Sequence, residues 1–189
     1  MREHTVTNPE ILAVFQGWDE QNFDNIIQSR NRQPDLWDDS DYDNVSAHYT
    51  QPQVLRADKR SYLEIFGETP AGQYLSNRLL PILNFEKYST AGYNPKGFIG
   101  WHDDHNITSH IVMITRCYSD QGYFRYLDTA TEQVVTLEDS PGWHVRSGTI
   151  GKEDETEYWH CAKTDAPRYT WIFHWWTKQD LAKAVDKIA

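Results

Sequence analysis

The spacing of hydrophobic positions changes near residue 85 of the chain. Before that point apolar residues recur every three or four positions, which predicts amphipathic helices at about residues 9–18, 19–30 and 59–83, the last interrupted near the segment GETPAG. Asn8 stands where the first helix needs an N-cap, and Pro9 follows at its first position. The residues expected to face inward are Ile11, Leu12, Phe15, Trp18, Phe23, Ile26, Ile27, Tyr62, Leu63, Ile65, Phe66, Tyr74, Leu75, Leu79 and Leu80.

After residue 85 the chain consists of short apolar or alternating segments separated by Gly, Asp, Asn and Pro, which is typical of strands. The expected strands are residues 85–93, 97–102, 109–118, 123–128, 132–138, 143–151, 156–162 and 168–176. Short, regularly spaced strands favour an antiparallel sandwich or barrel. Thr177 and Asp180 form a pattern like a capping box, which predicts a last helix.

These patterns predict one α+β domain in which a helical layer supports a β-sandwich. The domain is expected to span residues 1–189. Residues 1–84 would form the helical support, residues 85–177 the β core and residues 178–189 the C-terminal helix.

The composition of the chain restricts which partners and which location it can be expected to have. The net charge of −10 disfavours binding to phosphate backbones. No apolar run is long enough for a membrane span and no secretory signal begins the chain, so a cytoplasmic location is expected. Two cysteines, Cys117 and Cys161, do not make a disulfide framework, although a single pair between them stays open. The aspartates of Asp35–Asp43 predict a solvated loop or, alternatively, a contact surface for a basic partner.

The stretch GWHDDHN concentrates possible metal ligands. On an extended chain His102 and Asp104 point to the same side, and His160 is the best candidate for a third ligand. Two histidines and one carboxylate are typical of a non-haem Fe(II) site with open positions. Arg168 follows His160 by eight residues, and its planar fork suits a carboxylate. His105 is left open as a ligand, a residue that orients Asp104, or a surface residue.

The segments YNPKGFIGWHDD and WHCAKTDAPRYTWIF resemble the 2-oxoglutarate/Fe(II)-dependent dioxygenases, and most of all their prolyl 4-hydroxylase-like group. The resemblance covers about residues 85–177 and implies a double-stranded β-helix, or jelly roll. Carried onto this sequence, it implies the metal ligands His102, Asp104 and His160, and the co-substrate contacts Arg168, Tyr93, Tyr118 and Thr170.

The resemblance also implies a reaction. Fe(II), 2-oxoglutarate and dioxygen would hydroxylate a C–H bond and release succinate and CO2, with ascorbate as a further candidate cofactor. No catalytic residue is expected beyond the metal ligands. The expected substrate is a prolyl or other protein side chain; a free amino acid, a small metabolite or a nucleobase is the alternative.

Two readings from other classes remain, a cupin-type metal-binding protein without turnover and a zinc hydrolase. The segment RYTWIFHWW lacks the Arg-x-Asn-x-x-x-Arg pattern of the nucleic-acid repair branch, which disfavours a nucleic-acid partner. Nothing in the sequence indicates an oligomeric state.

Overall fold

The computed structural model describes residues 1–21, 60–61, 67–95, 97–102, 109–128, 130–131, 133–150 and 159–189, with the backbone alone at residues 60, 61, 102 and 109. Several predictions lie outside the described residues: most of the second helix, residues 62–66 of the third helix, the loop Asp35–Asp43, the beginning of the strand expected at 156–162, and the positions of Asp104 and His105. The residues expected to face inward that lie there are Phe23, Ile26, Ile27, Tyr62, Leu63, Ile65 and Phe66.

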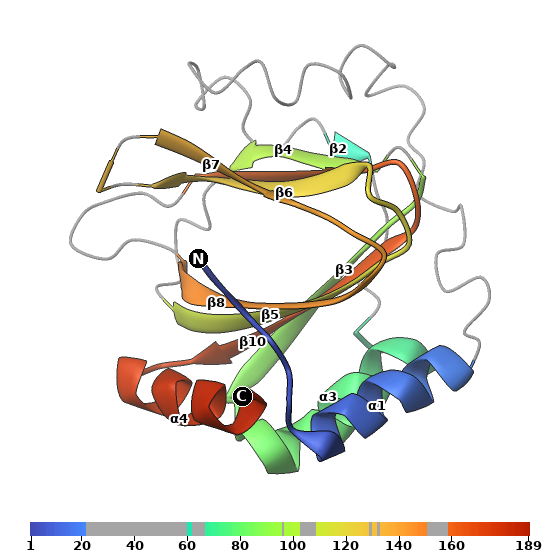
Figure 1. Cartoon of the computed structure of the whole chain (residues 1–189), viewed down its shortest axis with the longest axis vertical. Coiled ribbons are helices and arrows are strands. Elements are labelled where there is room, and N and C mark those ends of the chain that lie inside the picture. The colour runs from blue at the N-terminus through green and yellow to red at the C-terminus, as the bar shows by residue number, and fades with distance from the viewer. Residues whose placement is uncertain are drawn as a thin grey trace.

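Two antiparallel five-stranded sheets face each other (Figure 1). The first, which we call the helix-covered sheet, has the strand order β1-β8-β5-β10-β3, and the second, which we call the outer sheet, has the order β2-β4-β9-β6-β7. The strands are β1 (Arg2–His4), β2 (Arg60–Ser61), β3 (Lys87–Tyr93), β4 (Phe98–His102), β5 (Ser109–Cys117), β6 (Gly122–Asp128), β7 (Gln133–Glu138), β8 (Gly142–Ile150), β9 (His160–Thr164) and β10 (Arg168–Trp175).

The eight strands from β3 to β10 pair in a nested order. The first pairs with the last, β3 with β10, and inward from there β4 pairs with β9, β5 with β8 and β6 with β7. Successive pairs therefore alternate between the two sheets. The pairs β3–β10 and β5–β8 lie in the helix-covered sheet, and the pairs β4–β9 and β6–β7 lie in the outer sheet. This arrangement is the jelly roll, or double-stranded β-helix. The predicted fold class, α+β with a helical N-terminal layer and a short C-terminal helix, is confirmed.

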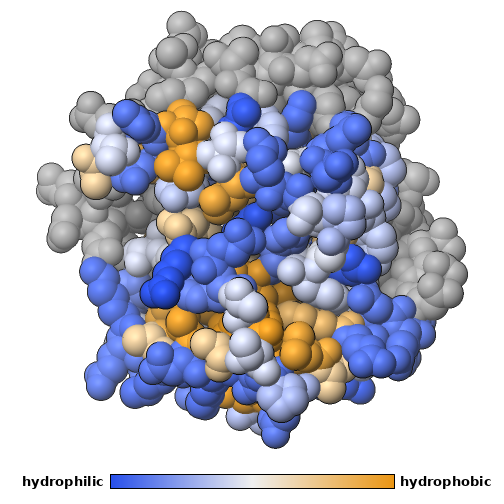
Figure 2. Space-filling model, viewed as in Figure 1, coloured by the Kyte–Doolittle hydropathy of each residue, from blue (hydrophilic) through white to orange (hydrophobic). Residues whose placement is uncertain are grey.

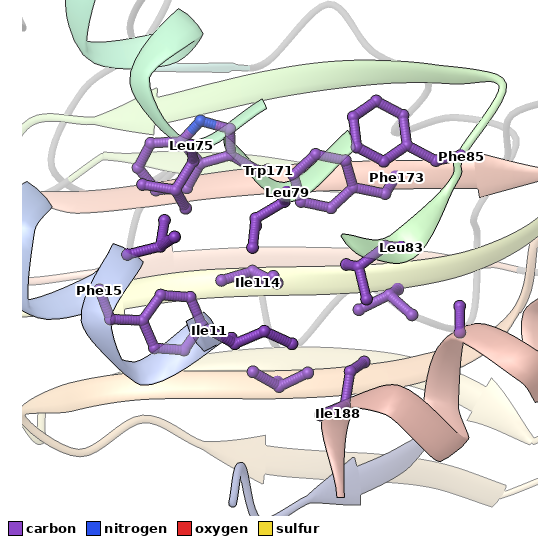
Figure 3. Packing of buried hydrophobic residues seen from close by; sticks show 14 of the residues in the cluster. Ile11, Phe15, Leu75, Leu79, Leu83, Phe85, Ile114, Trp171, Phe173 and Ile188 are labelled. Atoms are coloured by element: carbon purple, nitrogen blue, oxygen red, sulfur yellow. The ribbon is translucent and has the colours of Figure 1, made fainter. Parts of the chain in front are cut away.

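In the described part of the chain, three helices cover the outer face of the helix-covered sheet (Figure 1): α1 (Pro9–Glu20), α3 (Pro70–Leu83) and α4 (Lys178–Ile188). Their apolar faces meet the outward-facing aromatic residues of β10 in one core, part of which is drawn in Figure 3. The Trp171 indole donates a hydrogen bond to the carbonyl of Gly72 at 3.0 Å, which ties α3 to the sheet.

The predicted caps are present. Asn8 Oδ1 accepts from the backbone N–H of Glu10 at 2.9 Å, and Thr177 Oγ1 accepts from the N–H of Asp180 at 3.1 Å. These bonds satisfy donors that the first turn of a helix leaves free. The sequence therefore fixes where α1 and α4 begin.

Some predictions were wrong. Leu12 and Leu80 were expected to face inward, but they are 46% and 45% exposed. They lie beside the apolar stripes of α1 and α3 rather than on them, and isolated exposed leucines are common. Arg60–Ser61, expected to be helical, pair with β4 as the short strand β2. The strand Arg2–His4 was not anticipated.

The two cysteines are free and buried. Cys117 ends β5, in the helix-covered sheet, whereas Cys161 lies on β9, in the outer sheet, so the pairing left open by the sequence does not occur. In the part of the chain that the structure describes, no helix combines the length and the apolar character needed to cross a bilayer. Hydrophilic residues prevail on the face in Figure 2, and hydrophobic ones are visible mainly in its lower half.

Candidate functional site

A cavity of about 240 Å³ is lined by residues from both sheets. Four of the residues predicted from the sequence line it: Tyr93 from β3, His160 from β9, and Arg168 and Thr170 from β10. Most of the remaining wall is apolar, as at Met113 and other residues of the inner strand faces. The structure thus gathers one predicted metal ligand and three predicted co-substrate contacts around one space.

Strand alternation decides which side chains reach this cavity. Successive residues of a strand point to opposite faces of the sheet. On β10 the positions Arg168, Thr170, Ile172 and His174 face the cavity, while the aromatic residues between them pack beneath the helices. The tryptophan-rich end of the sequence is therefore mostly core, as its composition suggests.

Of the predicted metal ligands, the structure describes His160 and the backbone of His102. In the register of β4 and β9 the backbone of His102 lies opposite that of His160, after an irregularity in β4 that begins at Ile99. The imidazole of His160 is partly buried, with its ring centroid 5.6 Å from that of Phe124. Among the described side chains, which include neither His102 nor Asp104, no three His, Cys, Asp or Glu could hold a metal ion.

Arg168 is 1% exposed, and two of its three nitrogens are engaged. Its Nε donates to Asp139 Oδ2 at 3.0 Å, and its Nη1 donates to Thr170 Oγ1 at 3.1 Å. Nη2 is buried and has no hydrogen-bond partner among the described residues. The ring of Tyr93 lies 5.4 Å from the guanidinium carbon. Because a buried unpaired donor is costly, Nη2 is a position where a carboxylate would be bound favourably.

Asp139 was not anticipated, yet it joins two buried arginines. Besides its bond to Arg168, its Oδ1 lies 3.6 Å from Arg146 Nη1, and all three side chains are about 1% exposed. Burial alone would lower the pKa of Arg168, but Asp139, through its charge and its hydrogen bond, acts together with Cys117 and Tyr93 to raise that pKa above its ordinary value. Burial and the charge of Arg168 lower the pKa of Arg146. The two cations share one buried carboxylate, and the half-exposed Glu3 supplies a second, 3.6 Å from Arg146 Nε.

The approach of Asp139 to the outer sheet requires glycine at position 122. A Cβ there would lie 2.7 Å from Asp139 Oδ2 and 3.0 Å from the carbonyl oxygen of Lys163. The backbone N–H of Asp139 donates to the Gly122 carbonyl at 2.9 Å. In the sequence, Asp139 stands only in a turn-like segment, LEDSPG, and no motif marks it as part of a site.

Neither Cys117 nor Tyr118 lines the cavity. Cys117 lies opposite Arg168 in the register of β5 and β10, and burial, the largest cause, raises the pKa of its thiol to about 11. It is therefore a protonated, buried thiol rather than a nucleophile. Tyr118, predicted as a co-substrate contact, is 46% exposed and packs against Tyr169, so the structure does not bring it into the cavity.

No family model and no curated protein sequence matches the chain. Among solved structures it is similar to a prolyl-4-hydroxylase from Pseudomonas putida, with 16% identity and a TM-score of 0.39 over 71% of this chain and 87% of that one. It is also similar to YcfD, a ribosomal oxygenase from Escherichia coli, with 16% identity and a TM-score of 0.34 over 59% of this chain and 29% of that one. An oxalate oxidase matches with 12% identity and a TM-score of 0.33 over 46% of this chain and 40% of that one. These TM-scores are low, so the case for function rests on the site itself.

Proposed function

We propose that this protein is an Fe(II)- and 2-oxoglutarate-dependent dioxygenase that hydroxylates a C–H bond of its substrate. The observation that carries the proposal is the cavity that His160 and Arg168 line together, with a buried, unpaired guanidinium nitrogen on Arg168. His102, Asp104 and His160 would hold the metal, and the register of β4 and β9 supports the first and last of these. Histidine and carboxylate are the donors that suit such an iron.

When bound, iron and 2-oxoglutarate would supply the oxidising power needed to hydroxylate a C–H bond with dioxygen. The chain itself binds and orients. Nη2 of Arg168 donates to the far carboxylate of the co-substrate, while Asp139 and Thr170 hold the guanidinium from its other nitrogens. Apolar wall residues such as Met113 and Ile150 exclude water, which strengthens the charged contact.

The resemblance to the prolyl 4-hydroxylase-like group supports a prolyl or other protein side chain as substrate. The alternative keeps the same chemistry on a free amino acid, a small metabolite or a nucleobase. A cupin-type protein that binds metal without turnover would need no buried arginine with an unpaired donor in the same cavity, so Arg168 favours an enzyme.

The proposal is tested by adding Fe(II), ascorbate and 2-oxoglutarate and measuring succinate, together with calorimetric titration of 2-oxoglutarate in the presence of Mn(II). His160→Ala should weaken metal and co-substrate binding together. Because Arg168 and Asp139 are a buried pair, they are best changed together, as Arg168→Met with Asp139→Asn. This double variant should keep its metal affinity and lose about tenfold or more in 2-oxoglutarate affinity, the expected loss for a charged hydrogen bond.

Two results would contradict the proposal. One is wild-type protein that neither binds nor consumes 2-oxoglutarate. The other is a double variant whose metal and 2-oxoglutarate affinities fall by the same factor, since Arg168 would then not be a contact for the co-substrate.

A further inference from the structure

The cavity has an unusual charge for this protein. The chain carries a net charge of −10, yet no aspartate or glutamate is among the described residues that line the cavity. Apart from His160, its basic residues stand at both ends of β10, Arg168 at the start and His174 near the end, with Lys87 opposite His174 on β3. Arg168 and His174 are six positions apart along the strand, a span of about 20 Å. Arg168 and His174 are therefore too far apart to contact the same carboxylate group.

The end of the cavity away from Arg168 is built from three polar side chains, which we call the Lys87 end: Lys87, Ser89 and His174. Ser89 Oγ lies 3.4 Å from His174 Nε2. The Lys87 ammonium lies 5.0 Å from the ring centroid of Trp176, and among the described residues no carboxylate forms an ion pair with it. The Lys87 ammonium and the Ser89 hydroxyl can both donate hydrogen bonds to an anion bound at this end of the cavity.

His160 lies between the two ends. Three residues connect β9 to β10, so Thr164 at the end of β9 lies near the level of Arg168, where the connection joins the two sheets (Figure 1). His160 is four residues back along β9, about 13 Å from Thr164 towards the Lys87 end. A ligand held at the Lys87 end would therefore extend towards His160 from the side opposite to Arg168.

We infer that Lys87, with Ser89 and His174, binds a carboxylate of the primary substrate. The substrate is accordingly a carboxylic acid whose reacting C–H bond is directed towards His160. This inference rests on the proposed function, because it assigns the Arg168 end to 2-oxoglutarate. In this arrangement Arg168 binds the carboxylate of 2-oxoglutarate, and Lys87 binds the carboxylate of the primary substrate.

The test uses a panel of N-acetyl-L-amino acids and the matching primary amides, titrated into the protein with Mn(II) and 2-oxoglutarate and followed by ligand-observed NMR. Each pair differs only in the carboxylate. A peptide of three residues with a free C-terminus and its amide form a further pair, which distinguishes a free acid from a peptide terminus as the source of the carboxylate. At least one acid should bind about tenfold or more tightly than its amide, as expected for a charge-assisted hydrogen bond.

Lys87→Met should abolish this preference and change 2-oxoglutarate affinity by less than about twofold, whereas Lys87→Arg should retain much of it. Lys163→Met is the matched control, since Lys163 lies on β9 near the ring of Tyr123 and does not line the cavity. It removes the same charge and should leave both affinities unchanged. Thermal unfolding of each variant checks that the fold is intact.

The inference is overturned if no acid in the panel binds more tightly than its amide, or if the preference survives Lys87→Met. It is also overturned if Lys87→Met weakens 2-oxoglutarate binding as much as acid binding, because the two would then share one site. Failure of the proposed function looks different. In that case 2-oxoglutarate does not bind through Arg168, while the Lys87-dependent preference for acids persists.

Discussion

Among single residues, Asp139 is the buried carboxylate that pairs with both Arg168 and Arg146. Asp139→Asn would leave Arg168 without an ion pair among the described residues, and Arg146 with only Glu3, whose carboxylate lies 3.6 Å from its Nε and whose side chain is 52% exposed. Removing one partner of a buried ion pair destabilises a protein by about 3–5 kcal/mol, so we expect a loss of that size in the free energy of unfolding, measured in urea.

Asp19→Asn is the matched control for this variant. Asp19 accepts a hydrogen bond from Arg116 Nε at 2.8 Å, similar in length to the bond between Asp139 and Arg168, but its side chain is 36% exposed. Exposed pairs contribute about 1 kcal/mol or less, so the loss should be at most that. Equal losses for the two variants would show that burial of Asp139 has no energetic consequence.

The sequence places some of these residues and not others. Arg168 and Thr170 could be placed in the cavity because they belong to a motif and share the period of one strand. Asp139 and Lys87 could not, because they reach the site only through the pairing of distant strands. Tyr118 shows the same limit, since it follows the last residue of β5 and alternation no longer sets its direction there. The metal ligands His102 and Asp104 stay predictions.

Among the elements, α3 provides a sharp test of how the helical layer stabilises the sheet. Leu79 is fully buried against the helix-covered sheet, and its neighbour Leu80 is 45% exposed. Leu79→Ala should lower the free energy of unfolding by about 2–5 kcal/mol through lost burial and a cavity. Leu80→Ala should change it by about 0.5 kcal/mol or less. Denaturant titration of both variants measures the difference, and similar losses would contradict the packing of α3 seen here.

Whether a segment forms a helix or a strand was easier to predict than the direction in which each of its side chains points. Caps and turn residues mark where α1, α4 and the strands begin, because they satisfy backbone groups locally. Leu80 was assigned to the wrong face because an apolar residue beside the stripe cannot be told from one on it by spacing alone. The strand β2 has two residues and exists only through pairing with β4, so no local pattern indicates it.

Across the whole molecule, the nested strand order cannot be derived from hydrophobic spacing, which predicts strands but not their partners. Only the resemblance implied a jelly roll before the pairing of β3 with β10 and β6 with β7 was known. That order has a chemical consequence. It buries both cysteines in regular strands, Cys117 in one sheet and Cys161 in the other, and burial raises the pKa of their thiols to about 11 and about 12.

Because of these raised pKa values, the stability of the whole protein should fall at alkaline pH. In the unfolded chain the thiols lose their protons at their ordinary pKa, whereas in the folded protein they keep them to about pH 11. Above the ordinary pKa the folded state therefore binds more protons than the unfolded state, and the free energy of unfolding decreases as pH rises. Between pH 8 and 10 the two thiols together should contribute a loss of about 3 kcal/mol. A variant with Cys117→Ala and Cys161→Ala starts from lower stability but should lose about 3 kcal/mol less than the wild type over this range, in urea titrations at each pH. If both proteins lose the same amount, the buried thiols do not remain protonated in the folded state.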